Sequence, residues 1–166
     1  MSNTTLTEFK EAVDEEIKSY KAMEELYKLK QAVLIQGKSD ILWDVDAKIV
    51  DRMKTIKELD VRRKGIARYL GNESLSMTEA IAKAQNSNIG LAEKMKTQQK
   101  TLNILASSIS LYEKTNMDLI KHGLIMTGKT LNIIVNALLP QANQYNKEGQ
   151  NVKNEKFQLS SVIEEA

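Results

Sequence analysis

Apolar residues recur alternately three and four positions apart along most of this chain, and almost nothing interrupts them. The 166 residues include a single proline, Pro140, and seven glycines. This spacing places apolar side chains on one face of an α-helix, whereas proline and glycine are the residues that usually end an element. The pattern therefore predicts an all-α fold of a few long helices, three-helix bundle or coiled-coil-like, and it disfavours a sheet with many turns.

Three long helices are predicted, near residues 6–36, 40–70 and 77–139. Gly37 and Gly71 mark the ends of the first two, because glycine readily adopts the conformation that follows a helix. The turn after Gly37 is short, so the first two helices are expected to form an antiparallel hairpin. The third helix would be about 95 Å long at 1.5 Å per residue, about twice the length of either partner.

Residues that cap helices stand where these segments begin. A capping box pairs a serine or threonine with a glutamate three residues later. Two pairs with this spacing precede the first and third helices, namely Thr5 with Glu8 and Ser76 with Glu79. The second helix is expected to take its cap from Ser39 or Asp40.

The third helix changes character towards its end. No strong helix breaker stands before Pro140, so the helix must overhang the hairpin or kink near Gly123 or Gly128. Residues 117–139 are apolar on every face, and a helix of this kind is normally buried. The segment is therefore bundle core, a homodimer seam, or a surface that receives a partner's amphipathic helix.

Six apolar side chains of this segment are candidates for binding a partner. Five of them flank the heptad seam, so they stay free if the seam itself packs on the hairpin. The six are Met117, Ile120, Leu124, Leu131, Ile134 and Leu138.

Composition excludes several other classes of protein. The net charge is +2, whereas a dedicated nucleic-acid binder is expected to show a clearly basic face. The chain has no cysteine and one histidine, His122, which leaves no thiolate metal site and almost no room for a histidine-based catalytic or metal centre. We therefore predict no enzymatic activity, no cofactor and no metal.

The chain is expected to be cytoplasmic and soluble. Its first residues lack a basic region followed by an apolar block, so they do not predict a signal peptide. The longest stretch without a charged residue, 130–146, contains too many asparagines and glutamines for a membrane span. Residues 1–140 are predicted to form the helical domain, and the Asn/Gln-rich residues 141–166 a flexible polar tail.

One nucleotide-binding motif occurs in the chain. Residues 123–130, GLIMTGKT, match the phosphate-binding loop G-x-x-x-x-G-K-[ST]. That loop needs a strand before it and a helix after it, whereas the preceding residues continue a helical heptad. A nucleotide-binding function is therefore the least favoured alternative, and the glycines are expected to be sites of close helix packing instead.

The C-terminal half of the chain resembles the FlgN family of flagellar type III export chaperones. The resemblance rests on Asn116-x-x-Leu119-Ile120, the run to Leu138, Pro140, and the segment YNKEGQ that begins at Tyr145. The earlier segments are similar too, with a Gly-x-x-Asp turn after the first helix and Leu70-Gly71 after the second. The family usually has a Tyr-Gly pair where this chain has Tyr145-Asn146.

The resemblance implies a helical chaperone whose clients are hook–filament junction proteins of the FlgK and FlgL type. Such a chaperone holds the C-terminal segment of its client and delivers it to the export gate, which Tyr145 would contact. The main alternative is a structural coiled-coil homodimer or adaptor protein with residues 117–139 as its seam.

Overall fold

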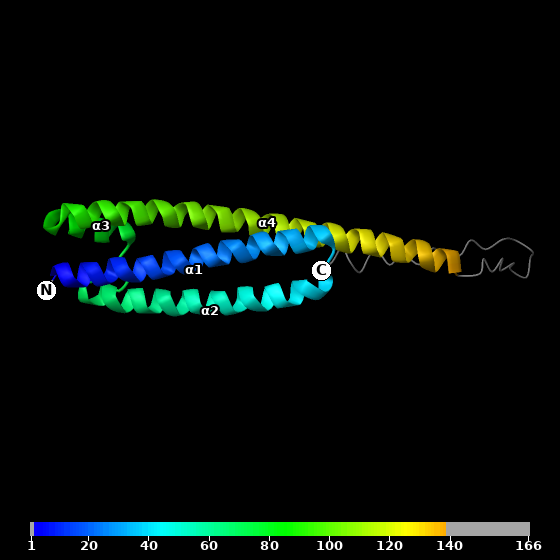
Figure 1. Ribbon diagram of the computed structural model, residues 1–166, viewed down its shortest axis with the longest axis horizontal. Helices are drawn as coiled ribbons and strands as arrows, with labels where there is room; N and C mark the ends of the chain where they lie inside the picture. The colour runs from blue at the N-terminus through cyan, green and yellow to red at the C-terminus, as the bar shows by residue number, and fades with distance from the viewer. Residues whose placement is uncertain (1, 139–166) are drawn as a thin grey trace, which may run out of the picture. The chain divides into compact units, whose positions relative to one another are not determined.

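The computed structural model describes residues 2–138, which form four α-helices and no strand. The helices are α1 (Ser2–Gln36), α2 (Ser39–Tyr69), α3 (Met77–Ser87) and α4 (Ile89–Leu138) (Figure 1). The all-α prediction is confirmed for this part of the chain. The chain divides into two compact units, Met1–Met117 and Asp118–Ala166, and each is described by itself. The predicted domain boundary at residue 140 and the predicted tail lie outside the described residues.

Helices α1 and α2 run antiparallel, and ion pairs fix their register. Lys30 on α1 lies 2.7 Å from Asp46 on α2, and Glu16 lies 2.7 Å from Arg63. The turn between the helices depends on Gly37, whose φ of 66° lies in the left-handed region that side chains other than glycine rarely adopt. The backbone N–H groups of Gly37 and of Lys38 donate to carbonyls of the last turn of α1, as expected of a glycine stop.

Two of the three predicted helix caps are wrong. Helix α1 already begins at Ser2, so Thr5 lies inside the helix and does not cap it. Helix α2 begins at Ser39 and its N-cap position is Lys38, which makes no side-chain capping bond. The capping box of Ser76 and Glu79 is confirmed, because the Ser76 side chain accepts from the Glu79 N–H and the Glu79 carboxylate accepts from the Ser76 N–H.

The predicted continuous helix over residues 77–139 is also wrong, because the chain breaks at Asn88. This residue has extended backbone angles, φ −156° and ψ 98°. Its own N–H donates to the Ala84 carbonyl and ends α3, while its Oδ1 accepts from the Leu91 N–H at 3.1 Å and begins α4. One asparagine therefore caps both helices, and α3 folds back along the start of α4 (Figure 1), where Gln99 Nε2 donates to Thr78 Oγ1 at 3.0 Å.

Within the first unit, α4 runs parallel to α1. The amide of Gln98 donates to the Lys10 carbonyl and to Asp14, Ser108 donates to Glu24, and the amide of Asn116 donates to the Tyr27 carbonyl. Partners on both helices advance in the same direction, as Figure 1 also shows. Helix α4 continues through Gly123 and Gly128 without a break.

Two clusters of buried apolar side chains hold the first unit together. The larger one joins the N-terminal half of α1 to the end of α2, to α3 and to the first half of α4, and Phe9, Leu6 and Met95 are fully buried in it. The smaller one lies nearer the α1–α2 turn around Met23 and Val45. The first two helices supply the whole of the smaller cluster, whereas more than half of the larger one comes from residues 75–105.

Candidate functional site

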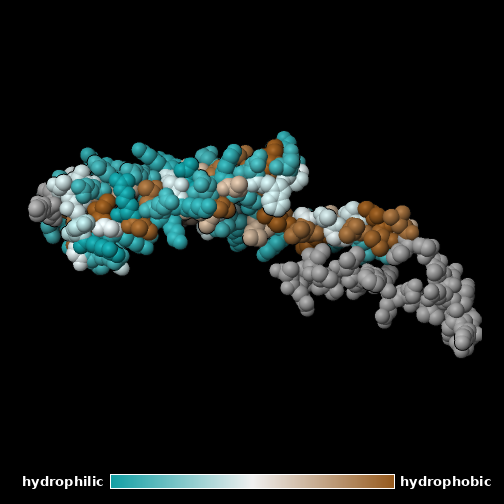
Figure 2. Space-filling model, turned by 90° about the horizontal axis from the view of Figure 1, so that it is seen from below, coloured by the Kyte–Doolittle hydropathy of each residue, from teal (hydrophilic) through white to brown (hydrophobic). Residues whose placement is uncertain are grey.

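The end of α4 carries apolar side chains that nothing in the described structure covers. The last buried residue of α4 is Asn116, and none of the described residues from Met117 to Leu138 is buried. Figure 2 shows apolar side chains crowded on this part of α4. We call residues 117–138 the apolar end of α4.

Two buried amide side chains mark how far α4 packs against α1. Gln98 and Asn116 occupy positions of the heptad seam, and both are almost fully buried. The NH₂ group of each donates to an α1 carbonyl, which offsets part of the cost of burying the amide. Their side-chain oxygens, Gln98 Oε1 and Asn116 Oδ1, have no hydrogen-bond partner in the described structure. Asn116 is the last buried amide residue along α4, and the seam positions that follow it, such as Leu119 and Met126, are not buried.

All six predicted partner-binding residues lie on this segment, and the structure places them on one side of the helix. At 100° per residue they fall within a sector about 100° wide. Five of them are exposed and Ile120 is half-buried: Met117, Ile120, Leu124, Leu131, Ile134 and Leu138. The neighbouring seam sector is apolar as well, so about 200° of the helix surface is apolar and the distinction between seam and flank disappears here.

The remaining sector of the apolar end is more polar and weakly charged, although the exposed Ile125 lies within it. It carries Asp118, Lys121 and Lys129, and no ion pair joins them within the described residues. Asn136 donates to Asn132 Oδ1 at 2.8 Å along the same sector. With so few charges, the segment can bind a partner mainly through apolar contact, and the polar sector orients the partner only weakly.

The phosphate-loop match is part of this helix and lacks the conformation that binds phosphate. Residues 123–130 are all helical, so their backbone N–H groups face along the helix axis and do not form a cradle. The hydroxyls of Thr127 and Thr130 donate to the carbonyls four residues earlier. The expectation of close packing at the glycines is wrong for Gly123, where an added Cβ would have no atom within 4 Å.

No metal or catalytic centre is found in the part of the chain that the structure describes. No group of three or more metal-ligating side chains comes together there. His122 is exposed on α4. Three titratable groups of the first unit have pKa values raised by burial. They are Glu16, despite its bond to Arg63, and the two tyrosines Tyr20 and Tyr27.

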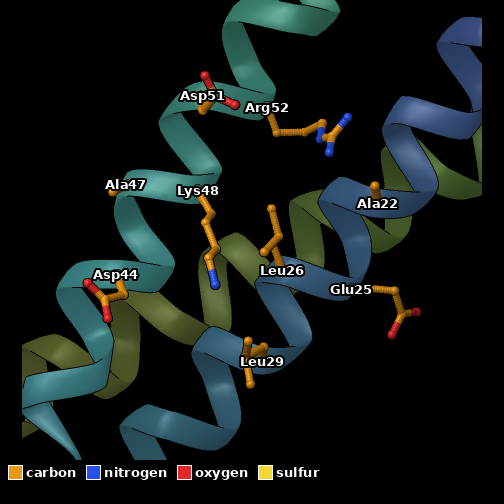
Figure 3. Close-up of a pocket in the computed structure, with 9 residues that line it drawn as sticks. All are labelled: Ala22, Glu25, Leu26, Leu29, Asp44, Ala47, Lys48, Asp51 and Arg52. Atoms are coloured by element: carbon orange, nitrogen blue, oxygen red, sulfur yellow. The ribbon is translucent and has the colours of Figure 1, made fainter.

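A shallow groove with a volume of about 740 Å³ lies between α1 and α2. Figure 3 shows Leu26 and Lys48 pointing into it and Arg52 reaching from α2 towards α1. The Arg52 Nε is buried and has no hydrogen-bond partner in the described structure. Acidic, basic and apolar side chains alternate around the groove without converging on one point, so it does not resemble a catalytic site.

The chain is similar to a known protein family over nearly its whole length. The family model described as FlgN protein matches residues 1–153, which is nearly the whole chain. Neither the curated proteins nor the solved structures give a match. No helix among residues 2–138 is long and apolar enough to cross a membrane. Tyr145, the predicted contact of the export gate, lies within the matched range but outside the described residues.

Proposed function

Because the chain belongs to the FlgN family, a family of flagellar export chaperones and not of enzymes, we propose that its clients are hook–filament junction proteins of the FlgK and FlgL type. The protein binds the C-terminal segment of such a client in the cytoplasm. It then delivers the client to the export gate. The observation that carries this proposal is the apolar end of α4, in which no described residue is buried.

The apolar end of α4 suits an amphipathic client segment. A helix that docks through residues spaced three, four and seven apart needs a complementary apolar surface several turns long. Leu124, Leu131 and Leu138 supply that spacing, each one heptad after the last. The client segment would order as it binds, and the cost of ordering keeps the complex reversible. Reversibility is what a carrier needs, because it must release the client at the export gate.

Calorimetry with the full-length chaperone tests this proposal. The probes are the C-terminal segments of the FlgK-type and FlgL-type proteins of the same bacterium, each as a peptide. We expect one peptide to bind per chain, with a negative heat-capacity change, because binding buries apolar surface.

A control peptide and two contrary outcomes complete the titration. A scrambled peptide of the same composition should not bind, because its apolar residues no longer share one face. Absence of binding by both client peptides would contradict the proposal, and a chain that instead self-associates through residues 117–138 would support the coiled-coil alternative.

A further inference from the structure

A second apolar surface lies on a solvent-facing side of α2, beside the sector of its buried residues. Trp43, Val50, Met53 and Val61 are 78%, 52%, 56% and 62% exposed. At 100° per residue they fall within a sector about 80° wide, next to the sector in which Val45 and Ile49 are buried. We call this surface the outer α2 stripe. It belongs to the first unit and shares no residue with the apolar end of α4.

We propose that the outer α2 stripe binds the same stripe of a second copy of this chain, with the two α2 helices antiparallel. An isologous contact of this kind requires a surface that complements itself under a two-fold rotation. The charges along α2 meet that requirement, because the two halves of the helix carry opposite excess charge.

Opposite charges are concentrated in the two halves of α2. Residues 39–53 contain four acidic and two basic side chains, and residues 54–69 contain two acidic and six basic ones. Some of these are already engaged, since Arg62 and Arg63 pair with α1. The charged residues without an ion-pair partner among residues 2–138 keep the same order. The first half has three acidic and two basic ones (Asp40, Asp44, Asp51, Lys48 and Arg52), and the second half has one acidic and two basic ones (Glu58, Lys54 and Lys57).

This distribution of charge favours a second copy of the chain as the partner and an antiparallel orientation of the two α2 helices. An antiparallel second copy places the acidic half of one α2 against the basic half of the other. A parallel copy would place acid against acid and Lys57 against Lys57, which opposes association. A uniformly acidic partner or an anionic surface would match only the basic half of α2, whereas an antiparallel second copy matches both halves.

One register brings apolar and charged side chains together along the stripe. When Val50 faces Met53 of the second copy, symmetry repeats that contact on the other side of the axis. Lys57 then faces Asp46 of the second copy, and Trp43 comes against Val61. Asp46 already accepts from Lys30 at 2.7 Å, and a carboxylate has room for a second cation. The contact is short, so we expect a reversible dimer at the weak end of specific interfaces.

Sedimentation equilibrium of the full chain tests the dimer, measured from micromolar to millimolar concentration. The mass should rise from the 18.7 kDa of one chain towards twice that value. Val50→Asp places two carboxylates near the axis, and we expect it to weaken the dimer about tenfold or more. Ile104→Asp is the matched control, because Ile104 is 60% exposed on α4 and should leave the dimer intact.

Charge exchange and cross-linking test the register. Lys57→Asp should weaken the dimer, and adding Asp46→Lys should restore it. The chain has no cysteine, so introduced thiols are unique. A chain with both Trp43→Cys and Val61→Cys should cross-link to a dimer under oxidation, whereas Trp43→Cys alone should not.

Three results would overturn the proposal. They are a monomer at every concentration, cross-linking by Trp43→Cys alone, and a dimer that survives Val50→Asp but not a double Leu124→Asp and Leu131→Asp exchange. The last result would move the interface to the apolar end of α4. None of these measurements uses a client, so the dimer and the proposed client binding can fail separately.

Discussion

Exchanging Leu124 and Leu131 for aspartate should abolish client binding without unfolding the protein. Both side chains belong to the apolar end of α4, one heptad apart on the same side of the helix. Leu124 is 57% exposed and Leu131 is 49% exposed. About half of each side chain is therefore still available for burial against a client.

The expected magnitude follows from that exposed half. Burying a whole leucine side chain contributes about 2 kcal/mol, so each of these residues can add about 1 kcal/mol on client binding. Loss of both contacts alone would weaken binding about thirtyfold. Each aspartate also has to be dehydrated, and for an ionised carboxylate this costs at least the roughly 1 to 3 kcal/mol of an unpaired uncharged polar group. Together the two exchanges should weaken binding about a thousandfold or beyond.

Calorimetry with the client peptide measures the loss, and far-ultraviolet circular dichroism measures the fold. The free variant should keep its helix content, because neither leucine is buried and aspartate lowers helix propensity by only about 0.5 kcal/mol. A double exchange of Ile104 and Leu111 for aspartate is the control, since these residues are 60% and 65% exposed on the same helix. It should bind the client normally. Unchanged affinity in the Leu124 and Leu131 variant, or loss of its helix content, would refute the reasoning.

Three further predictions concern other parts of the chain. Lys129→Ala should leave client binding intact, and ATP should not bind to the protein in a titration, because residues 123–130 are helical. ATP binding that Lys129→Ala abolishes would contradict this prediction. Arg63→Met should lower the unfolding free energy at pH 7 by about 3 kcal/mol, because it leaves the buried Glu16 carboxylate without its cation. The Glu16 pKa is then raised further in the folded state, so the deficit in urea unfolding should shrink as the pH falls from 7 towards the unfolded pKa; a deficit independent of pH would argue against it. Tyr145→Asp should leave client affinity unchanged and reduce export of the client into the medium, and equal loss of both would place Tyr145 in the client site.

The ends of α1 and α2 were predictable from the sequence because glycine readily adopts a positive φ. Gly37 and Gly71 have φ values of 66° and 100°, which other residues rarely adopt, so a glycine between two apolar repeats is a strong signal. The break at Asn88 was not predictable in the same way. Asn88 also fits the heptad spacing, and an asparagine inside a helix looks the same in the sequence as one that caps it. The distinguishing fact is the bond from the Leu91 N–H to its side chain, which exists only in the folded chain.

The candidate surface was predictable in composition but not in exposure. The apolar character of residues 117–138 follows from the sequence directly, whereas their burial depends on which turn of α4 is the last to pack. The prediction left the flank free on the condition that the seam packs on the hairpin, and that condition is not met after Asn116. Seam and flank positions alike, such as Ile133 and Leu131, are exposed there.

The position of that last packed turn is itself encoded in two polar residues. A heptad seam that is apolar throughout can slip by one repeat at little cost, because each apolar side chain finds an equivalent site. Gln98 and Asn116 prevent this in α4, since a slip would separate both buried amides from the α1 carbonyls that they bond. The register of α4 against α1 is therefore fixed by hydrogen bonds, although its affinity for α1 comes from apolar packing. It follows that the same two amides determine which apolar residues of α4 are buried and which stay available to a client.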